Sequence, residues 1–375
     1  MTAVLKDKVD NRRDVFIEQL LASNFTTYFA ATHPKYATAN KAFRFTATPT
    51  SAAVPYSWKY QDARAKLFEL GGLLTVEEAE RRNINFVNPA LRTFMPAASL
   101  TTLRGGIQLL LPGEKAYTHR HAANAFRFVL EAPETGAFTI VQGTKIPMHP
   151  GDLVLTPNWT WHDHHNESDS HAIWYDGLDV LMAYFLGGVF SEEFEDAAGE
   201  SYQPVERGAD AMLHRYGEGL LHHTKMFPDH IPASNNPLLY YPYSRARQAL
   251  QNLLEAGAGN AFDGVLIEYV NPLTGGPTFP SMNTSLRIVP GKSRLEARHR
   301  TENVMFITME GSVTFHLPDN QTFQTAPFDV TAMPSWVPYS ISNSENEPAV
   351  LFSNSDRPLF EKLGFYREAA PFAST

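Results

Sequence analysis

Two blocks of this 375-residue sequence repeat the same order of apolar runs and turn residues. Residues 112–128 and 290–306 both begin with Pro-Gly and end with Phe, and 178 positions separate Pro112 from Pro290. A second pair of anchors, Pro-Asn-Trp at 157–159 and Pro-Ser-Trp at 334–336, is offset by 177 positions. Two anchors in the same order and at nearly the same spacing predict an internal duplication.

Each block is built from short apolar runs separated by turns. In the first block these runs lie at 105–111, 126–130, 137–141 and 153–156, and the strand pattern resumes near Val265. Short strands at this spacing predict an all-β fold of the sandwich or jelly-roll type. Helical patterns lie outside them at 14–22, at 75–82 with Thr75 as N-cap, and at 244–255. We therefore expect an N-terminal helical or extended segment at 1–95, a β domain at 96–188, a connecting region with a helix at 189–258, and a second β domain at 259–375.

The composition excludes several classes of function. The chain has no cysteine, so disulfides, thiolate nucleophiles and iron–sulfur clusters are excluded, and any metal must be held by nitrogen and oxygen. A formal charge of -9 without a basic block disfavours nucleic acid as a partner. The N-terminus lacks the apolar core of a signal peptide, and no run approaches ~20 apolar residues. These features predict a cytoplasmic protein that does not bind a membrane.

The first block contains a spaced set of histidines. His119 and His121 follow Gly113 in the pattern Gly-x5-His-x-His, and His162 closes a later Gly-x5-Pro-x4-His. In a strand, the i, i+2 spacing places the first two rings on one face, and a neighbouring strand can supply the third. Three neutral imidazoles leave a divalent metal with its full charge and with open positions, which suits a redox-active Fe(II). The same ligands also describe a hydrolytic zinc site.

The second block serves as an internal control for this interpretation. With the offsets of the two anchors, 178 and then 177, His119 corresponds to Ala297, His121 to His299 and His162 to Tyr339. The glycine, proline and tryptophan framework persists while two of the three imidazoles are lost. This selective loss predicts that the first block binds metal and that the second retains only the fold.

Several longer strings resemble a known family. They are Gly-x-Gln-Leu-x-x-Pro-Gly-Glu at 106–114, His-Arg-His at 119–121, Pro-x-Trp-Thr-Trp-His-Asp-His at 157–164, Trp-Tyr-Asp-Gly-Leu-Asp at 174–179 and Ser-Asp-Arg-Pro at 355–358. The arrangement resembles the cupin superfamily. From about Trp58 to Glu368 the chain is similar to the gentisate/salicylate/1-hydroxy-2-naphthoate 1,2-dioxygenases. The resemblance implies two cupin domains, with helical N-terminal and connecting segments.

The resemblance also implies a reaction. In this family, Fe(II) binds an aromatic ortho-hydroxy acid and O2, and the ring opens between the carboxyl-bearing and hydroxyl-bearing carbons. A homotetramer acting in aromatic catabolism is implied as well. By resemblance, the further site residues are Gln108, hydrogen-bonded to substrate or oxygen, Asp176, facing the far side of the ring, and Arg82, a second ligand of the substrate carboxylate.

Two more residues are assigned from their surroundings. The common cupin pattern has a glutamate ligand shortly after His-x-His, whereas here Arg127 follows, and its ungapped counterpart is Met305. A guanidinium beside a metal can bind a substrate carboxylate, which is the role we predict for Arg127, with a salt bridge to an acidic neighbour as the alternative. His164 lies two residues after His162, so an extended segment would place it on the same side as an acid/base, whereas His165 is expected in solvent.

The sequence leaves the substrate open. Gentisate is the family's commonest substrate, while salicylate, 1-hydroxy-2-naphthoate, nitro- or amino-salicylates and anthranilate share the chelating head. Arg104 stands where relatives usually carry an aromatic or apolar residue, and in a regular strand it shares a side with Gln108. It either meets a polar ring substituent or turns outward at a bulge. A non-catalytic bicupin would have no need of Arg127 and Gln108 in only one block.

Overall fold

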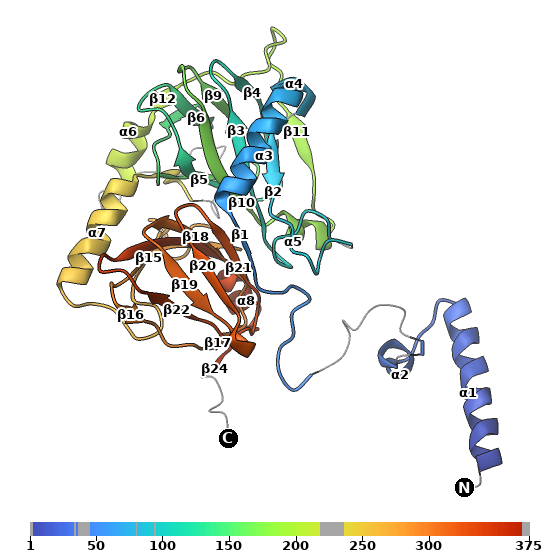
Figure 1. Ribbon diagram of the computed structural model, residues 1–375. Coiled ribbons are helices and arrows are strands. Elements are labelled where there is room, and N and C mark those ends of the chain that lie inside the picture. Colours follow the sequence, from blue (N-terminus) through green and yellow to red (C-terminus); the bar gives the residue numbers. More distant parts are fainter. Residues whose placement is uncertain are drawn as a thin grey trace. The chain divides into compact units, whose positions relative to one another are not determined.

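The computed structural model describes residues 3–33, 35–36, 46–79, 81–93, 95–217 and 236–369 (Figure 1). The chain divides into two compact units, residues 1–50 and residues 51–375. The first unit holds α1 (Ala3–Ala22) and α2 (Tyr28–Thr32), whose N-cap Thr27 accepts a hydrogen bond from the Ala30 amide. In the described part of the chain no helix is both long and apolar enough to span a bilayer.

The second unit contains two β-barrels, and we call the one made of two six-stranded sheets the first cupin. Its inner sheet has the order β13 (Tyr240–Tyr241), β8 (Leu153–Thr156), β5 (Ala125–Glu131), β10 (Ala172–Leu178), β3 (Arg104–Leu110) and β2 (Asn83–Asn85). Its outer sheet has the order β11 (Ser191–Glu193), β4 (Lys115–His121), β9 (His162–Asn166), β6 (Ala137–Val141), β7 (Thr144–Pro147) and β12 (Arg207–Gly208). The expected connecting segment therefore begins with a strand, because 191–193 pairs with β4.

The second cupin repeats this plan. Its inner sheet has the order β1 (Tyr56–Trp58), β21 (Val330–Met333), β18 (Val304–Glu310), β23 (Ala349–Ser355), β15 (Asn283–Val289) and β14 (Val265–Glu268). Its outer strands are β16 (Ser293–Arg294), β22 (Ser340–Asn343), β19 (Val313–His316) and β20 (Thr322–Thr325), and β17 (His299–Arg300) pairs with β24 (Glu368–Ala369). Strands dominate both halves, as predicted for an all-β bicupin.

Helices cover the edges of the two barrels. They are α3 (Tyr60–Leu73), α4 (Val76–Ala79), α5 (Val180–Phe185), α6 (Ala209–Met212), α7 (Tyr243–Glu255) and α8 (Arg357–Lys362). Helix α3 packs on β3, and α7 packs on β14 and β15 (Figure 1). The predicted N-cap at Thr75 is confirmed, since its hydroxyl accepts from the Glu78 amide at 3.2 Å while the Glu78 carboxylate accepts from the Thr75 amide at 3.0 Å. This reciprocal pair satisfies two amides that have no partner within the helix.

The inner sheets face each other, and alternation along β5 divides its side chains between two environments. Phe128 stacks on Phe352 of the second cupin, with ring centroids 4.0 Å apart, and Phe126 lies 5.6 Å from the same ring. Arg127 points the other way, into the first barrel, because successive side chains of a strand alternate in direction. The packing between the cupins thus fixes the face on which β5 presents its polar residue.

The duplication is confirmed, but the ungapped offset of 178 is wrong for the residues that line the barrels. His119 pairs across strands with His162, and the matching bridge in the second cupin joins Arg298 and Tyr339. The offset is therefore 179 before the second anchor and 177 after it, where Trp159 and Trp336 both adopt a positive φ (59° and 65°). A slip of one residue exchanges the two faces of a strand. The true counterparts, with the ungapped ones in parentheses, are Arg298 (Ala297) for His119, Arg300 (His299) for His121, Arg287 (Leu286) for Gln108 and Phe306 (Met305) for Arg127.

A reciprocal pair of buried carboxylates, here called the inter-cupin clasp, joins the two halves. Asp179 accepts hydrogen bonds from the amide and side chain of Asn124, both at 2.8 Å, and from the hydroxyl of Ser281, which precedes β15. Asp356 accepts from the amide and side chain of Asn303, both at 2.7 Å, and from the hydroxyl of Thr102, which precedes β3. Each cupin thus supplies one hydroxyl to the carboxylate of the other.

Candidate metal centre and substrate cavity

The structure brings together the three histidines predicted from the sequence. His119 and His121 project from the same face of β4, and His162 lies opposite His119 at the start of β9. One ring nitrogen from each lies within 4.8 Å of those of the other two. Since imidazole nitrogens bind a zinc or iron ion at about 2.0–2.2 Å, three nitrogens this close can share one ion.

Backbone carbonyls set the orientation of the rings. The Nδ1 atoms of His121 and His162 each lie 2.9 Å from a carbonyl oxygen, of Ala123 and Thr160 respectively. A ring that donates from Nδ1 keeps the lone pair of Nε2 free, and the Nε2 of His162 is buried without a hydrogen-bond partner. Burial, reinforced by the neighbouring cations, lowers the pKa of His119 to about 2, and burial lowers that of His121 to about 4. The rings are therefore neutral at physiological pH, as metal binding requires.

A hydrogen-bonded loop holds the two strands that carry the histidines. The side-chain oxygen of Asn124 accepts from the Asn158 amide at 2.9 Å, and the Trp159 amide donates to the His121 carbonyl at 2.9 Å. Because Asn124 also binds Asp179, this arm of the inter-cupin clasp reaches the loops on both sides of the histidine cluster. Loops joined in this way resist separate movement of β4 and β9.

The histidines open on a cavity of about 120 Å³ that is rich in hydrogen-bond donors. Besides the three histidines it is lined by Arg81, Asn83, Asn85, Arg104, Gly106, Gln108, Ala125, Arg127, Asp176 and Leu178. Three guanidinium groups thus face a single carboxylate. The cavity suits an anionic ligand that can also reach a metal.

Arg127 is a fixed cation at the base of this cavity. It is 4% exposed, donates to the Thr156 hydroxyl at 3.0 Å, and its Nε lies 3.8 Å from an Asp176 carboxylate oxygen. Burial lowers the pKa of Arg127 to about 10, so it remains charged at neutral pH. Burial raises the pKa of Asp176, while Arg127 opposes this rise and the Trp174 indole donates to the carboxylate at 3.0 Å. Arg127 therefore has both the salt-bridge partner considered above and a place at the cavity.

Gln108 and Arg104 lie on the cavity side of β3, with Gly106 between them. A Cβ atom at Gly106 would lie 2.8 Å from the Ile84 carbonyl oxygen, so only glycine allows β2 to approach this closely. The Nε of Arg104 donates to the Asn85 side chain at 2.7 Å, which holds the guanidinium at the cavity. Of the two orientations considered for Arg104, the structure shows the inward one.

Arg82 does not line the cavity, contrary to the sequence-based expectation. It is 1% exposed and forms a salt bridge with Glu114. Alternation about β2 is the reason, because it turns Arg81, Asn83 and Asn85 to the cavity and Arg82 away from it. The Arg81 guanidinium instead contacts the Nδ1 of His119. Sequence reasoning missed these three residues, although the period of two from 81 to 85 carried the signal.

The two histidines that follow His162 also differ from expectation. His164 shares the face of His162 but is fully buried beside Trp174, with ring centroids 5.0 Å apart, and does not line the cavity. His165, expected in solvent, is buried and stacks on Phe138 at 4.8 Å. Both lie in a strand that is covered on its two faces, which the local sequence does not reveal.

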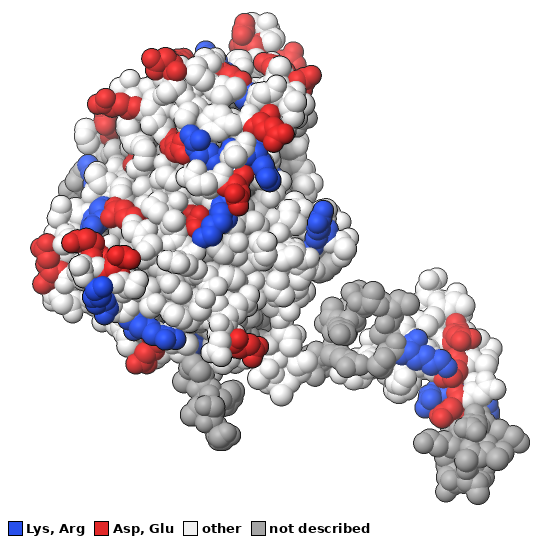
Figure 2. All heavy atoms as spheres, viewed as in Figure 1, with Lys and Arg blue, Asp and Glu red and all other residues white. Residues whose placement is uncertain are grey.

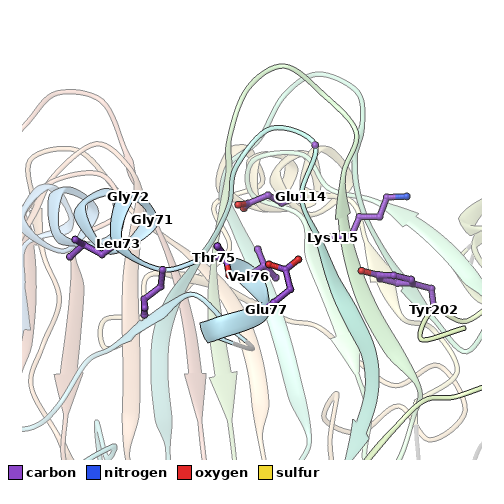
Figure 3. A pocket seen from close by; sticks show the side chains of 11 residues that line it. Gly71, Gly72, Leu73, Thr75, Val76, Glu77, Glu114, Lys115 and Tyr202 are labelled. Atoms are coloured by element: carbon purple, nitrogen blue, oxygen red, sulfur yellow. The ribbon is translucent and has the colours of Figure 1, made fainter. Parts of the chain in front are cut away.

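A larger depression elsewhere on the described surface is a poorer site for an anionic acid. This depression of about 510 Å³ is lined by residues 71–77 and 113–115 together with Tyr202 (Figure 3). Its charged residues are two carboxylates, Glu77 and Glu114, and Lys115, and it holds neither histidine nor arginine. On the face seen in Figure 2, acidic and basic side chains are interspersed. The histidine-lined cavity is therefore the candidate active site.

Two β-barrels in one chain, with three converging imidazoles in the first, define a bicupin with a candidate metal site in one cupin. Residues 106–180 match the family model described as a cupin domain. The chain is 36% identical to gentisate 1,2-dioxygenase 1 of Aquipseudomonas alcaligenes, over 86% of this chain and 89% of the relative. It is 33% identical to a 1-hydroxy-2-naphthoate 1,2-dioxygenase of a Nocardioides species, over 85% and 80%.

The structural comparison agrees. A salicylate 1,2-dioxygenase from Pseudoaminobacter salicylatoxidans, solved as adducts with gentisate, superposes with a TM-score of 0.81 at 27% identity, covering 97% of this chain and 94% of that one. The chain belongs to the family of gentisate, salicylate and 1-hydroxy-2-naphthoate 1,2-dioxygenases and is a ring-cleaving dioxygenase. The histidine cluster is its candidate metal site.

Proposed function

We propose that this enzyme uses Fe(II), held by His119, His121 and His162, to open the ring of a gentisate-like acid with O2. The observation that carries the proposal is a cluster of neutral imidazoles facing a cationic cavity. An ortho-hydroxy acid offers a carboxylate and a phenol oxygen as adjacent ligands. Bound Fe(II) supplies the redox chemistry that brings O2 and ring together.

The protein's own residues bind and orient the substrate. Arg127 pairs with the substrate carboxylate, and Asp176 limits the positions that the guanidinium can take, because the two groups lie 3.8 Å apart in a buried setting. Gln108 projects into the same cavity and can donate its amide hydrogens to a substrate oxygen. His164 is a layer behind the cavity, so we assign it to support of His162 and Trp174 rather than to acid/base work.

A polar substituent on the ring fits this cavity better than a bare hydrocarbon. Arg104, Asn83 and Asn85 add donors and acceptors to the wall, and leaving such groups without partners against an apolar ring costs free energy. A 5-hydroxyl, as in gentisate, or a 5-amino or 5-nitro group would give them partners. We therefore place gentisate and 5-substituted salicylates ahead of salicylate and 1-hydroxy-2-naphthoate.

An oxygen-electrode screen of these acids with freshly Fe(II)-loaded protein tests the proposal. We expect oxygen uptake with gentisate, one iron per chain, and no uptake after zinc loading. His121→Ala should lose both iron and uptake, while the control His299→Ala, in the second cupin, should keep both. Turnover by the zinc form, or two tightly bound irons per chain, would refute the assignment.

We also propose that the enzyme is a homotetramer of the cytoplasm, as the family resemblance implies. The apolar segment around the end of α5 supports assembly, since Tyr184, Phe185 and Leu186 are 69%, 64% and 77% exposed in the single chain. Exposed aromatic and aliphatic clusters mark protein contacts. Light scattering after size-exclusion chromatography measures the mass, and a monomer would contradict the proposal.

A further inference from the structure

The second cupin keeps a small cavity at the place that corresponds to the metal centre. The cavity has a volume of about 40 Å³. Arg298 and Arg300 stand where the first cupin has His119 and His121, and Tyr339 stands where it has His162. Arg287, the counterpart of Gln108, lines it as well. Two of the three positions that carry histidines in the first cupin thus carry arginines in the second.

Arg287 is the least satisfied of these side chains. It is 4% exposed and makes no hydrogen bond within the described part of the chain, and its one ionic contact is a 3.5 Å approach to Asp263. Its guanidinium lies 5.3 Å from the centre of the Phe306 ring. A buried guanidinium has five N–H donors, and leaving them unpaired is costly. Within the described part of the chain Arg287 therefore has no hydrogen-bonded acceptor, and its Nε is buried.

The neighbouring carboxylates are already engaged. Asp263 accepts from Arg298 and from Arg300, each at 2.6 Å, which uses both of its oxygens. Glu302 accepts from the Ser355 hydroxyl at 2.7 Å and lies 3.6 Å from Arg300. Near the mouth, Glu268 lies 4.0 Å from Arg357, and Glu368 lies 3.1 Å from Arg298. The cavity lining thus holds four arginines, Arg287, Arg298, Arg300 and Arg357, and three carboxylates, Asp263, Glu268 and Glu302.

The other polar atoms without partners here are donors too. The Nε atoms of Arg298 and Arg300 and the Tyr339 hydroxyl are buried without a hydrogen bond, and no unpaired carboxylate oxygen accompanies them among the described lining residues. Burial raises the pKa of Tyr339, so its hydroxyl stays protonated and can donate. A water molecule would bring two further donors into a site whose buried unpaired polar atoms are already donors. An anion would bring acceptors alone.

We propose that this cavity, here called the arginine pocket, binds a compact oxyanion with carboxylate chemistry, of the size of formate. The two oxygens of a carboxylate match the planar fork of a guanidinium, and a negative charge offsets the excess of cations among the lining residues. The volume sets the size limit, because the pocket has about 40 Å³ where the histidine-lined cavity has about 120 Å³. Acetate, phosphate and benzoate are therefore excluded or bound far more weakly.

Thermal unfolding of the iron-loaded enzyme tests the proposal. Sodium formate, compared with sodium chloride at equal ionic strength, should raise Tm of the wild type along a saturating curve. Arg287→Gln should lose that rise, with the formate Kd at least tenfold weaker. Arg294→Gln, which removes an exposed arginine of the same cupin, should respond as the wild type does. Equal stabilisation of wild type and Arg287→Gln would overturn the proposal, as would a wild type that shows no saturation.

Two further measurements keep the test decisive if Arg287→Gln does not fold. Tyr339→Phe removes one unpaired hydroxyl without changing charge, and it should weaken formate binding severalfold. A crystal structure grown with formate should show a planar three-atom density in contact with Arg287. A single water in that place would refute the proposal. Phosphate and benzoate serve as size controls, and stabilisation by either through Arg287 would contradict the stated ligand class.

Discussion

Replacing Arg127 with methionine should separate substrate binding from metal binding. The guanidinium is 4% exposed, and its fixed contacts are the Thr156 hydroxyl at 3.0 Å and Asp176 at 3.8 Å. None of the three histidine rings uses it as a hydrogen-bond partner, so the Arg127→Met protein should bind one iron as the wild type does. The substrate carboxylate, in contrast, loses its cation.

The size of the loss in kcat/KM follows from the burial of the pair formed by Arg127 and the substrate carboxylate. Losing one partner of a desolvated, hydrogen-bonded charge pair costs about 2–5 kcal/mol. At 1.4 kcal/mol per factor of ten, kcat/KM for gentisate should fall by roughly 30-fold to several thousandfold. Asp176 moderates the loss, since burial already raises its pKa and removal of Arg127 raises it further, so that the carboxyl can become neutral.

Catechol provides the internal control for this assay. It chelates iron through two oxygens but has no carboxylate, so its inhibition constant should be the same within about twofold for wild type and variant, well below the ~2 kcal/mol expected for a lost charge pair. Arg127→Lys should recover part of the gentisate activity, because it restores the charge without the planar fork. Equal loss of catechol and gentisate binding would refute the reasoning, as would loss of iron in Arg127→Met.

Three further predictions concern the clasp, its titration and the ring substituent. Asn124→Ala and its matched control Asn303→Ala should both lower the free energy of unfolding by about 1–3 kcal/mol. Only Asn124→Ala should weaken Co(II) or Fe(II) binding in a metal titration. Equal metal affinities of the two variants would contradict the link between the clasp and the histidine cluster. Burial raises the pKa of Asp356 from 3.8 to about 7, so its contribution to stability is present below about pH 4 and is lost as pH rises through 7. Urea unfolding of Asp356→Asn against wild type should show this loss, of a few kcal/mol, only in the wild type. Arg104→Trp should shift the ratio of kcat/KM values from 5-substituted salicylates toward salicylate by about tenfold or more, the worth of one hydrogen bond to a charged group, and an unchanged ratio would show that Arg104 does not contact the ring.

The sequence predicted the histidine cluster because its signals are local. The spacing of His119 and His121 fixes their common face, and the strand texture fixes the fold class. The prediction for Arg82 was wrong because only the register of the short strand β2 decides whether Arg81 or Arg82 points inward. The ungapped duplication failed for the same reason: the Pro-Gly anchors are offset by 178 residues but the strands beside them by 179, and this slip of one residue changes the face of every lining residue.

The burial of several polar residues could not be predicted from the local sequence. His164 and His165 stand in a polar string typical of a loop, yet β9 is an inner member of its sheet, and only its pairing with β4 and β6 shows that both are enclosed. The role of Asn124 depends on contacts with residues more than 30 positions away, Asn158 and Asp179. The periodicity of the sequence does not predict such long-range hydrogen-bonded pairs.

The inter-cupin clasp explains why a half without the histidine cluster is kept. Removing the second cupin would take Ser281 from Asp179 and expose Phe128 and its neighbours, and removing the first would take Thr102 from Asp356. Neither half can therefore be shortened to an independent domain without stranding a buried carboxylate in the other. After the duplication, each cupin came to need the other in order to fold. The second cupin could therefore lose its histidines, but it could not be deleted.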